Sequence, residues 1–115
     1  MNNQFSDLLR NVSMAPAVMQ VGFCGSNGKV WLVDSLNLKE TASALNTWKI
    51  MSDCFSVLTL HNLHVGRMIW DLDTGQIGVV HRKNIGACGC IVEAGIHAPV
   101  FKSHLDTLEE ALQLI

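Results

Sequence analysis

Charged residues are scarce in this 115-residue sequence, where only 16% of the side chains are Asp, Glu, Lys or Arg. An average soluble domain carries about 25%. The eight Lys and Arg residues are scattered along the chain, and the formal net charge is −2. No basic stripe is present to neutralise a row of phosphates, which argues against nucleic acid as a ligand.

Targeting and membrane-spanning segments are also missing. The N-terminal stretch MNNQFSDLLRNV has no basic region followed by an apolar one, as a secretory signal would. No run of the sequence approaches the ~20 apolar residues that are needed to span a bilayer. We therefore expect a cytoplasmic protein without a membrane span, whose four cysteines stay reduced instead of forming disulfides.

Apolar side chains, in contrast, are plentiful. Hydrophobic residues make up 49% of the chain and the mean hydropathy is +0.27. A chain of this length has room for one hydrophobic core, so we expect a single domain over residues 1–115. So few charges on so apolar a chain predict that part of its surface is covered by a partner.

Two short helices are predicted near the ends of the chain. Between Phe5 and Val12 the apolar side chains recur at helical spacing, and Pro16 prevents this helix from continuing. After Pro99, apolar side chains again keep helical spacing over residues 104–115. This second pattern predicts a terminal helix.

The segment over residues 35–62 is the longest predicted helix, because no Gly or Pro interrupts it. Ser35 or Asn37 would cap its start. On a helical wheel its first half groups Leu45, Trp48 and Met51 on one arc, and its second half adds Ile50, Cys54 and Val57 on the other side. Such a helix packs on its own sheet with one side. The apolar residues on its other side predict contact with a partner subunit, most simply an identical chain.

Alternating apolar residues and turn signals predict five strands, over residues 17–24, 29–35, 64–72, 76–82 and 85–93. The sequences GSNG and DTG supply the turns of two hairpins. In the last strand, Gly86 and Gly89 indicate a bulge or a close backbone contact. The predicted fold is therefore α+β, with a five-stranded antiparallel sheet, a long central helix, and helices at both ends.

This order of elements resembles the Roadblock family, which includes dynein light chains, late-endosomal scaffold subunits and bacterial small-GTPase regulators. The segment VMQVGFCGSNGKVWLVDS is similar to the first two strands of the family, and RMIWDLDTGQIGVVHRKNIGACGCIVEAG is similar to its last three. The sequence lacks the longer charged stretches that flank the central helix in many members. Profilin-like and longin-like folds are the near alternatives.

The resemblance implies a non-enzymatic scaffold or regulatory module of a small Ras-like GTPase, or of a motor or signalling complex. It implies dimerisation with an identical chain or a paralogous Roadblock-like subunit, through the central helix and a neighbouring strand edge. The interface residues that it implies are Leu45, Trp48, Met51, Phe55, Met68 and Trp70. It supplies no catalytic residue, metal or cofactor. For Trp48 and Trp70 a place in the domain's own core remains equally open.

Two cysteines suggest a different function. Cys88 and Cys90 lie two residues apart, so on a strand they point to the same face and could begin a zinc site. No second pair has zinc-finger spacing, and we favour buried, apolar thiols. The alternative function is a small-ligand, metal or redox sensor of profilin-like or PAS-like type, in which Cys54, Cys88, Cys90 and a histidine line a pocket.

Other chemistry-bearing patterns are weak. None of the five histidines lies beside a nucleophile in a known catalytic motif. The sequence GSNGK, residues 25–29, lacks the phosphate-loop pattern G-x-x-x-x-G-K-[ST] and lies between two strands instead of before a helix. The sequence therefore predicts neither an enzyme nor a phosphate loop.

Overall fold

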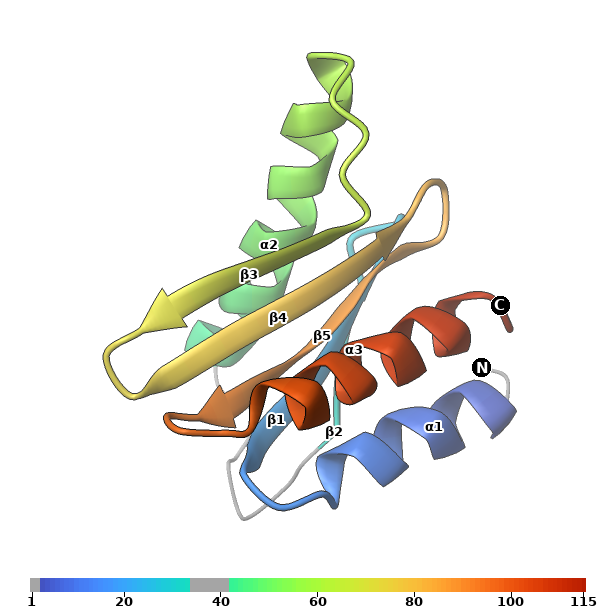
Figure 1. Cartoon of the computed structure of the whole chain (residues 1–115). Helices are drawn as coiled ribbons and strands as arrows, with labels where there is room; N and C mark the ends of the chain where they lie inside the picture. Colours follow the sequence, from blue (N-terminus) through green and yellow to red (C-terminus); the bar gives the residue numbers. More distant parts are fainter. Residues whose placement is uncertain (1–2, 34–41) are drawn as a thin grey trace.

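The structure, a computed structural model, describes residues 3–33 and 42–115. Its elements follow the predicted order (Figure 1), and the predicted α+β fold class is confirmed. The elements are α1 (Asn3–Ser13), β1 (Val18–Gly25), β2 (Val30–Val33), α2 (Ala42–Leu60), β3 (Arg67–Leu72), β4 (Gly75–Arg82), β5 (Gly86–Glu93) and α3 (Ala98–Leu112). None of the described helices is both long and apolar enough to cross a membrane.

The five strands form one antiparallel sheet in the order β2-β1-β5-β4-β3. The hairpins β1–β2 and β3–β4 are joined through β5, which pairs with β1 on one side and β4 on the other. The predicted second strand continued to residue 35, and its last two positions lie outside the described residues. The third strand was predicted to begin at residue 64, whereas β3 begins at Arg67. Residues 61–66 instead return from the end of α2 to the sheet (Figure 1).

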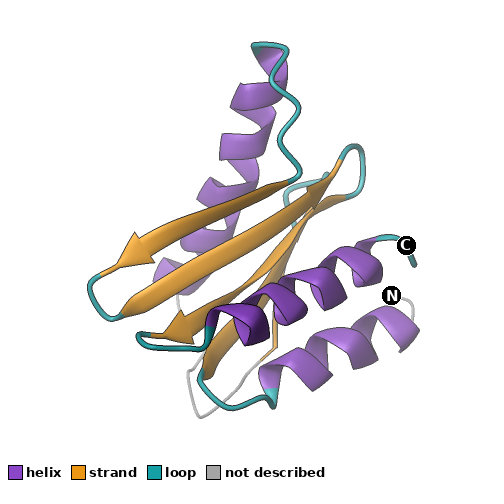
Figure 2. Ribbon diagram, in the orientation of Figure 1, coloured by secondary structure: helices purple, strands orange, loops and turns teal. Residues whose placement is uncertain are grey.

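The helices cover the two faces of the sheet unequally. Figure 2 shows α1 and α3 side by side on one face, and α2 crossing the other face alone. Val21, Phe23 and Cys88 point toward α1 and α3, whereas Ile77 and Val79 point toward α2. The alternation along each strand therefore divides the apolar side chains into two separate cores.

α2 ends where Asn62 adopts a left-handed backbone, with φ of 58°. The Leu63 N–H donates to the Leu58 carbonyl oxygen at 2.9 Å, a bond that closes many helix C-termini. The predicted cap positions at the start of this helix, Ser35 and Asn37, lie outside the described residues.

α3 begins earlier than the sequence pattern predicted. We expected the terminal helix over residues 104–115, after Pro99, whereas α3 starts at Ala98 and contains Pro99 in its first turn. The first N–H groups of a helix have no carbonyl partner within it, so a proline is tolerated there and its fixed φ suits the helix. The proline therefore opens this helix instead of preceding it.

Candidate interaction surface

A tryptophan anchors α2 to the sheet. Trp48 lies over Gly22 and Gly89, which face each other across β1 and β5. A Cβ atom on Gly22 would overlap the indole ring, and one on Gly89 would lie 3.0 Å from it. The indole N–H donates to Gln20 Oε1 at 2.9 Å, which satisfies both buried polar groups. The two glycines thus provide the space that lets the helix lie close to the strands.

Two turns further along α2, Phe55 makes the second contact with the sheet. Its ring stacks on the His81 ring of β4, with centroids 4.7 Å apart and an interplanar angle of 9°. Burial lowers the pKa of His81 below its ordinary value of 6.5. The neutral imidazole is therefore the form that packs against the phenyl ring at neutral pH.

The opposite side of α2 is apolar and exposed. Ile50 is 48% exposed and Val57 is 53% exposed, and Leu60 at the end of the helix reaches 82%. Between this side of α2 and β3 runs a groove of about 420 Å³. Its lining residues are Ile50, Asp53, Cys54, Val57, Leu58, Met68 and Trp70. We call these seven residues the α2–β3 groove.

β3 forms one wall of the groove and is also an edge of the sheet. It pairs with β4 alone among the described strands, so its outer N–H and C=O groups point away from the sheet. On the other face of β3, the Arg67 guanidinium donates to Asp106 at 2.9 Å and also pairs with Glu109 of α3. An apolar groove and an unpaired strand edge thus lie next to each other.

The residues predicted at the interface fall into two groups. Trp48 and Phe55 are each 1% exposed in the single chain, so they hold α2 on the sheet and offer almost no surface to a partner. Of the two interpretations left open for Trp48, the structure supports the core. The other four, Leu45, Met51, Met68 and Trp70, are partly exposed, and their interface role stays a prediction.

The groove includes three residues that the helical wheel had placed on the outer side of α2. Ile50, Cys54 and Val57 line it, although the family resemblance had not selected them. The signal that identifies them is the change in apolar arc between the first and second halves of the helix. The residues of that second arc lie beside β3 along the groove, away from the strands under Trp48.

The cysteines do not assemble into the sensor pocket of the alternative hypothesis. Cys88 and Cys90 point into the core beneath α1 and α3, whereas Cys54 lies on α2 at the opposite face. Burial raises the pKa of Cys90 to about 12 and that of Cys88 further, so both thiols stay protonated at neutral pH. Cys88 Sγ contacts the Leu108 carbonyl oxygen at 3.4 Å. Among the described residues, no group of three or more side chains is arranged to hold a metal ion.

Solved structures resemble the chain over nearly its whole length. Myxococcus xanthus MglB matches with a TM-score of 0.78 at 7% identity, over 97% of this chain and 94% of that protein. A Roadblock/LC7 domain from Streptomyces avermitilis matches with a TM-score of 0.69 at 12% identity, over 98% and 95%. The chain has the Roadblock fold.

A third structure with the Roadblock fold is the gliding protein MglB from Thermus thermophilus. It matches with a TM-score of 0.69 at 7% identity, over 97% of this chain and 90% of that one. No family model and no curated protein sequence matches the chain. The Roadblock fold is thus established by the path of the backbone, since the sequence identities are only 7–12%.

Proposed function

We propose that the chain is a non-enzymatic module that dimerises through the α2–β3 groove and regulates a small Ras-like GTPase in the cytoplasm. Dimerisation is supported by the apolar outer side of α2, which the described chain leaves uncovered. Regulation of a GTPase is supported by the fold. Two of the solved structures that share it are MglB proteins, and the family that the sequence resembles includes bacterial small-GTPase regulators.

The groove is suited to a symmetric contact between identical chains. A closed two-fold dimer places the same patch on both protomers, so an apolar helix side meets its own copy. A stable interface buries roughly 800 Å² on each partner, about one eighth of the 6763 Å² that the single chain exposes. The helix side and the unpaired edge of β3 together form one continuous patch for this purpose, and pairing would satisfy the outer backbone groups of β3.

Regulation by such a dimer would be geometric. Two protomers create a surface that neither has alone, and that surface would favour one arrangement of the switch loops of a GTPase. Two of the three arginines are already occupied, because Arg67 pairs with Asp106 and Glu109, and Arg82 donates to the Leu112 carbonyl oxygen at 3.1 Å. The third, Arg10, lies on α1 at the opposite face of the sheet from the groove, so we assign no catalytic arginine to the module.

The dimer is tested by a charge placed on the groove. Val57→Glu would bury a carboxylate in the proposed interface, whereas Val57 is half exposed in the single chain and the fold should tolerate the change. Light scattering after size exclusion should give twice the chain mass of 12.6 kDa for the wild type and the single mass for the variant. Circular dichroism should show unchanged secondary structure in both.

Val100→Glu is the matched control, because Val100 is an exposed valine on a helix of the opposite layer. It should remain dimeric. A wild-type chain that is monomeric at tens of micromolar, or an equal loss of mass in both variants, would contradict dimerisation through the groove.

GTPase regulation needs a separate measurement. The Ras-like GTPases of the source organism would be purified, and their nucleotide hydrolysis and exchange measured with and without the chain. We expect the wild type and Val100→Glu to change one of these rates and Val57→Glu to lose the effect. If no Ras-like GTPase of that organism binds the dimer, the regulatory part of the proposal is wrong even where the dimer is real.

A further inference from the structure

β2 forms the second edge of the sheet, on the far side from β3. It pairs with β1 alone among the described strands. Its four residues, Val30–Val33, are all apolar. Natural edge strands are commonly protected by a charge, a proline or a bulge, and none of these lies within Val30–Val33. The dimer proposed above would cover the β3 edge and leave the β2 edge open, because β4, β5 and β1 lie between the two.

The outer backbone groups of β2 belong to Val30 and Leu32. Hydrogen-bonded positions alternate along an antiparallel pair, and the Gly25 N–H donates to the Lys29 carbonyl oxygen at 2.9 Å. Counting from this bond, Trp31 directs its N–H and C=O groups to β1, and its two neighbours direct theirs outward. Within the described part of the chain, no backbone group bonds to these outer groups. An added strand would satisfy them.

A pocket of about 440 Å³ opens beside Trp31 on the α1 face of β2. Phe23, Trp31 and Ile85 line it, and all three belong to the core under α1 and α3 or pack against it. The Phe5 ring holds two of them, with its centroid 5.1 Å from that of Phe23 and 6.3 Å from that of Trp31. Lys29 is the one charged residue of the described lining, and it makes no ion pair with any residue that the structure describes. The pocket is therefore apolar and already formed, with an exposed cation at its rim.

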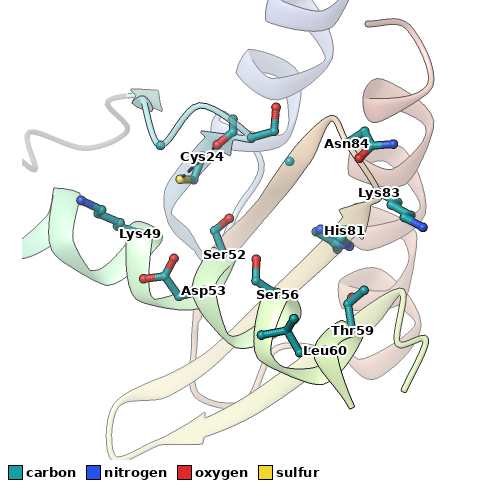
Figure 3. A pocket seen from close by; sticks show the side chains of 14 residues that line it. Cys24, Lys49, Ser52, Asp53, Ser56, Thr59, Leu60, His81, Lys83 and Asn84 are labelled. Atoms are coloured by element: carbon teal, nitrogen blue, oxygen red, sulfur yellow. Dashed lines mark hydrogen bonds between the residues drawn. The ribbon is translucent and has the colours of Figure 1, made fainter. Parts of the chain in front are cut away.

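The α2 side of the same hairpin turn offers no comparable site. The pocket there has Lys49 and Lys83 at its opposite ends, with their ammonium groups directed away from it (Figure 3). Ser52 already bonds to the Cys24 thiol. Among the described lining residues no set of donors converges on one ligand, so the α1 face is the side of the turn that suits a partner.

An added antiparallel strand would bring two of its side chains to the pocket on the α1 face. The residue opposite Trp31 would form a non-hydrogen-bonded pair, in which side chains lie closest, and its side chain would share the α1 face with the indole ring. An aromatic side chain suits this position, since aromatic pairs across strands are favourable. Two positions later, the added strand would place a side chain on the same face opposite Lys29, where a carboxylate would form an ion pair.

We infer that β2 binds an extended segment of a partner protein in which an aromatic residue precedes an acidic residue by two positions. The segment extends the sheet by one strand, with its aromatic ring in the pocket beside Trp31 and its carboxylate against Lys29. Backbone hydrogen bonds supply the affinity, and the two side chains select the sequence. Each chain carries a complete site, so the inference rests neither on dimerisation nor on regulation of a GTPase.

A synthetic peptide, acetyl-TVFVET-amide, carries this pattern and tests the inference on the full-length ¹⁵N-labelled chain. We expect saturable chemical-shift changes in β2, and slower hydrogen exchange at the amides of Val30 and Leu32. Exchange at the Trp31 amide, which is already bonded to β1, should not change. This alternation distinguishes an added strand from a side chain that merely contacts the pocket.

Two altered peptides separate the backbone from the side chain. Methylation of the two valine nitrogens removes the N–H groups that would face β2 and should abolish binding. Replacing phenylalanine by alanine should weaken binding by about tenfold. Absence of binding by the parent peptide at millimolar concentration, equal binding of the methylated peptide, or changes centred on β3 would overturn the proposal. Protection of Val30 and Leu32 in the free chain would also overturn it, because a second copy would then occupy the edge.

Variants of the chain test the two contacts separately. Lys29→Glu should weaken binding of the parent peptide by about fivefold, and the peptide acetyl-TVFVKT-amide should bind this variant better than the wild type. Val30→Pro removes one outer N–H and should weaken binding by about tenfold, since an edge strand tolerates proline where its N–H points away from the sheet. Equal affinity of the wild type and Lys29→Glu for both peptides would refute the role of the carboxylate.

Two further variants serve as controls. Lys102→Glu changes an exposed charge on α3 and should leave peptide binding unchanged. Val57→Glu, which should dissociate the proposed dimer, should bind the peptide as the wild type does. The mass of each sample is measured alongside, so the failure of peptide binding and the failure of dimerisation are distinguishable.

Discussion

The two faces of the sheet are completed in different ways. Under α1 and α3, sixteen buried residues form one continuous core, and two helices close it. Under α2, five buried residues form the corresponding cluster in the described part of the chain, and apolar side chains remain exposed on the helix above them. The chain's own helices α1 and α3 cover one face of the sheet, whereas the outer side of α2 on the other face is exposed. The inner side of α2 therefore stabilises the fold through Trp48 and Phe55, while its outer side remains exposed.

The largest effect should come from removing the anchor of the α2 face. Trp48→Ala would leave the space above Gly22 and Gly89 empty and leave Gln20 Oε1 without its donor. We expect a loss of about 3–5 kcal/mol in the free energy of unfolding. Urea unfolding followed by circular dichroism, in the Val57→Glu background so that association does not contribute, would measure it.

Trp70→Ala, measured in the same background, is the matched comparison. Trp70 is only partly buried at the sheet edge, so its removal should cost clearly less than that of Trp48. Equal losses for the two tryptophans would show that the α2 face does not depend on a single anchor.

A smaller effect should appear on the α1–α3 face at alkaline pH. Burial raises the pKa of Cys88 and Cys90 above their ordinary value of 9.0, so in the folded chain the thiols stay protonated while those of the unfolded chain ionise. The stability that this provides is complete below pH 9 and is lost as the pH rises toward 12. The free energy of unfolding should fall over this window, and the fall should be shallower in the double variant Cys88→Ala, Cys90→Ala. Parallel curves for the two proteins would exclude the thiols as the cause.

The ion pair that links β3 to α3 should contribute least. The hydrogen bond from Arg67 lowers the pKa of Asp106 below its ordinary value of 3.8, so the pair contributes above that pH and is lost as the pH falls through the lowered value. Both carboxylates are half exposed, and such pairs are weak. Arg67→Ala should lower the melting temperature slightly at pH 7 in dilute buffer and have no effect in about 1 M salt. A large, salt-independent loss would mean that Arg67 acts through packing instead.

The fold could be predicted from the sequence because its signals are local. The apolar spacing between Phe5 and Val12 and the alternation in each strand depend only on near neighbours. The prediction was wrong for the start of α3, because a proline can either end one segment or open the next. We placed the helix after Pro99, whereas helix geometry permits the proline within its first turn.

The surfaces could be predicted only in part. The apolar outer arc of the central helix followed from the positions of Ile50 and Val57. The side of the helix that faces the sheet, however, depends on where the Trp48 ring can pack against the strands. That space is produced by the register of β1 against β5, which no single segment specifies. The turn between β1 and β2 likewise meets the turn between β4 and β5 at one end of the sheet, although the two are far apart in sequence. Gly86 and Gly89 were the hints, since a glycine in a strand indicates a close contact, and a Cβ atom at either position would overlap a backbone carbonyl oxygen of the neighbouring strand.

The close packing of the indole ring on the strands limits how this sequence can drift. A methyl group at position 22 would overlap the ring, one at position 89 would overlap the Gly78 carbonyl oxygen, and a small side chain at position 48 would leave a hole. We therefore expect position 22 to gain bulk wherever position 48 loses it, whereas Gly89 stays glycine because the backbone of the neighbouring strand leaves no room for a side chain.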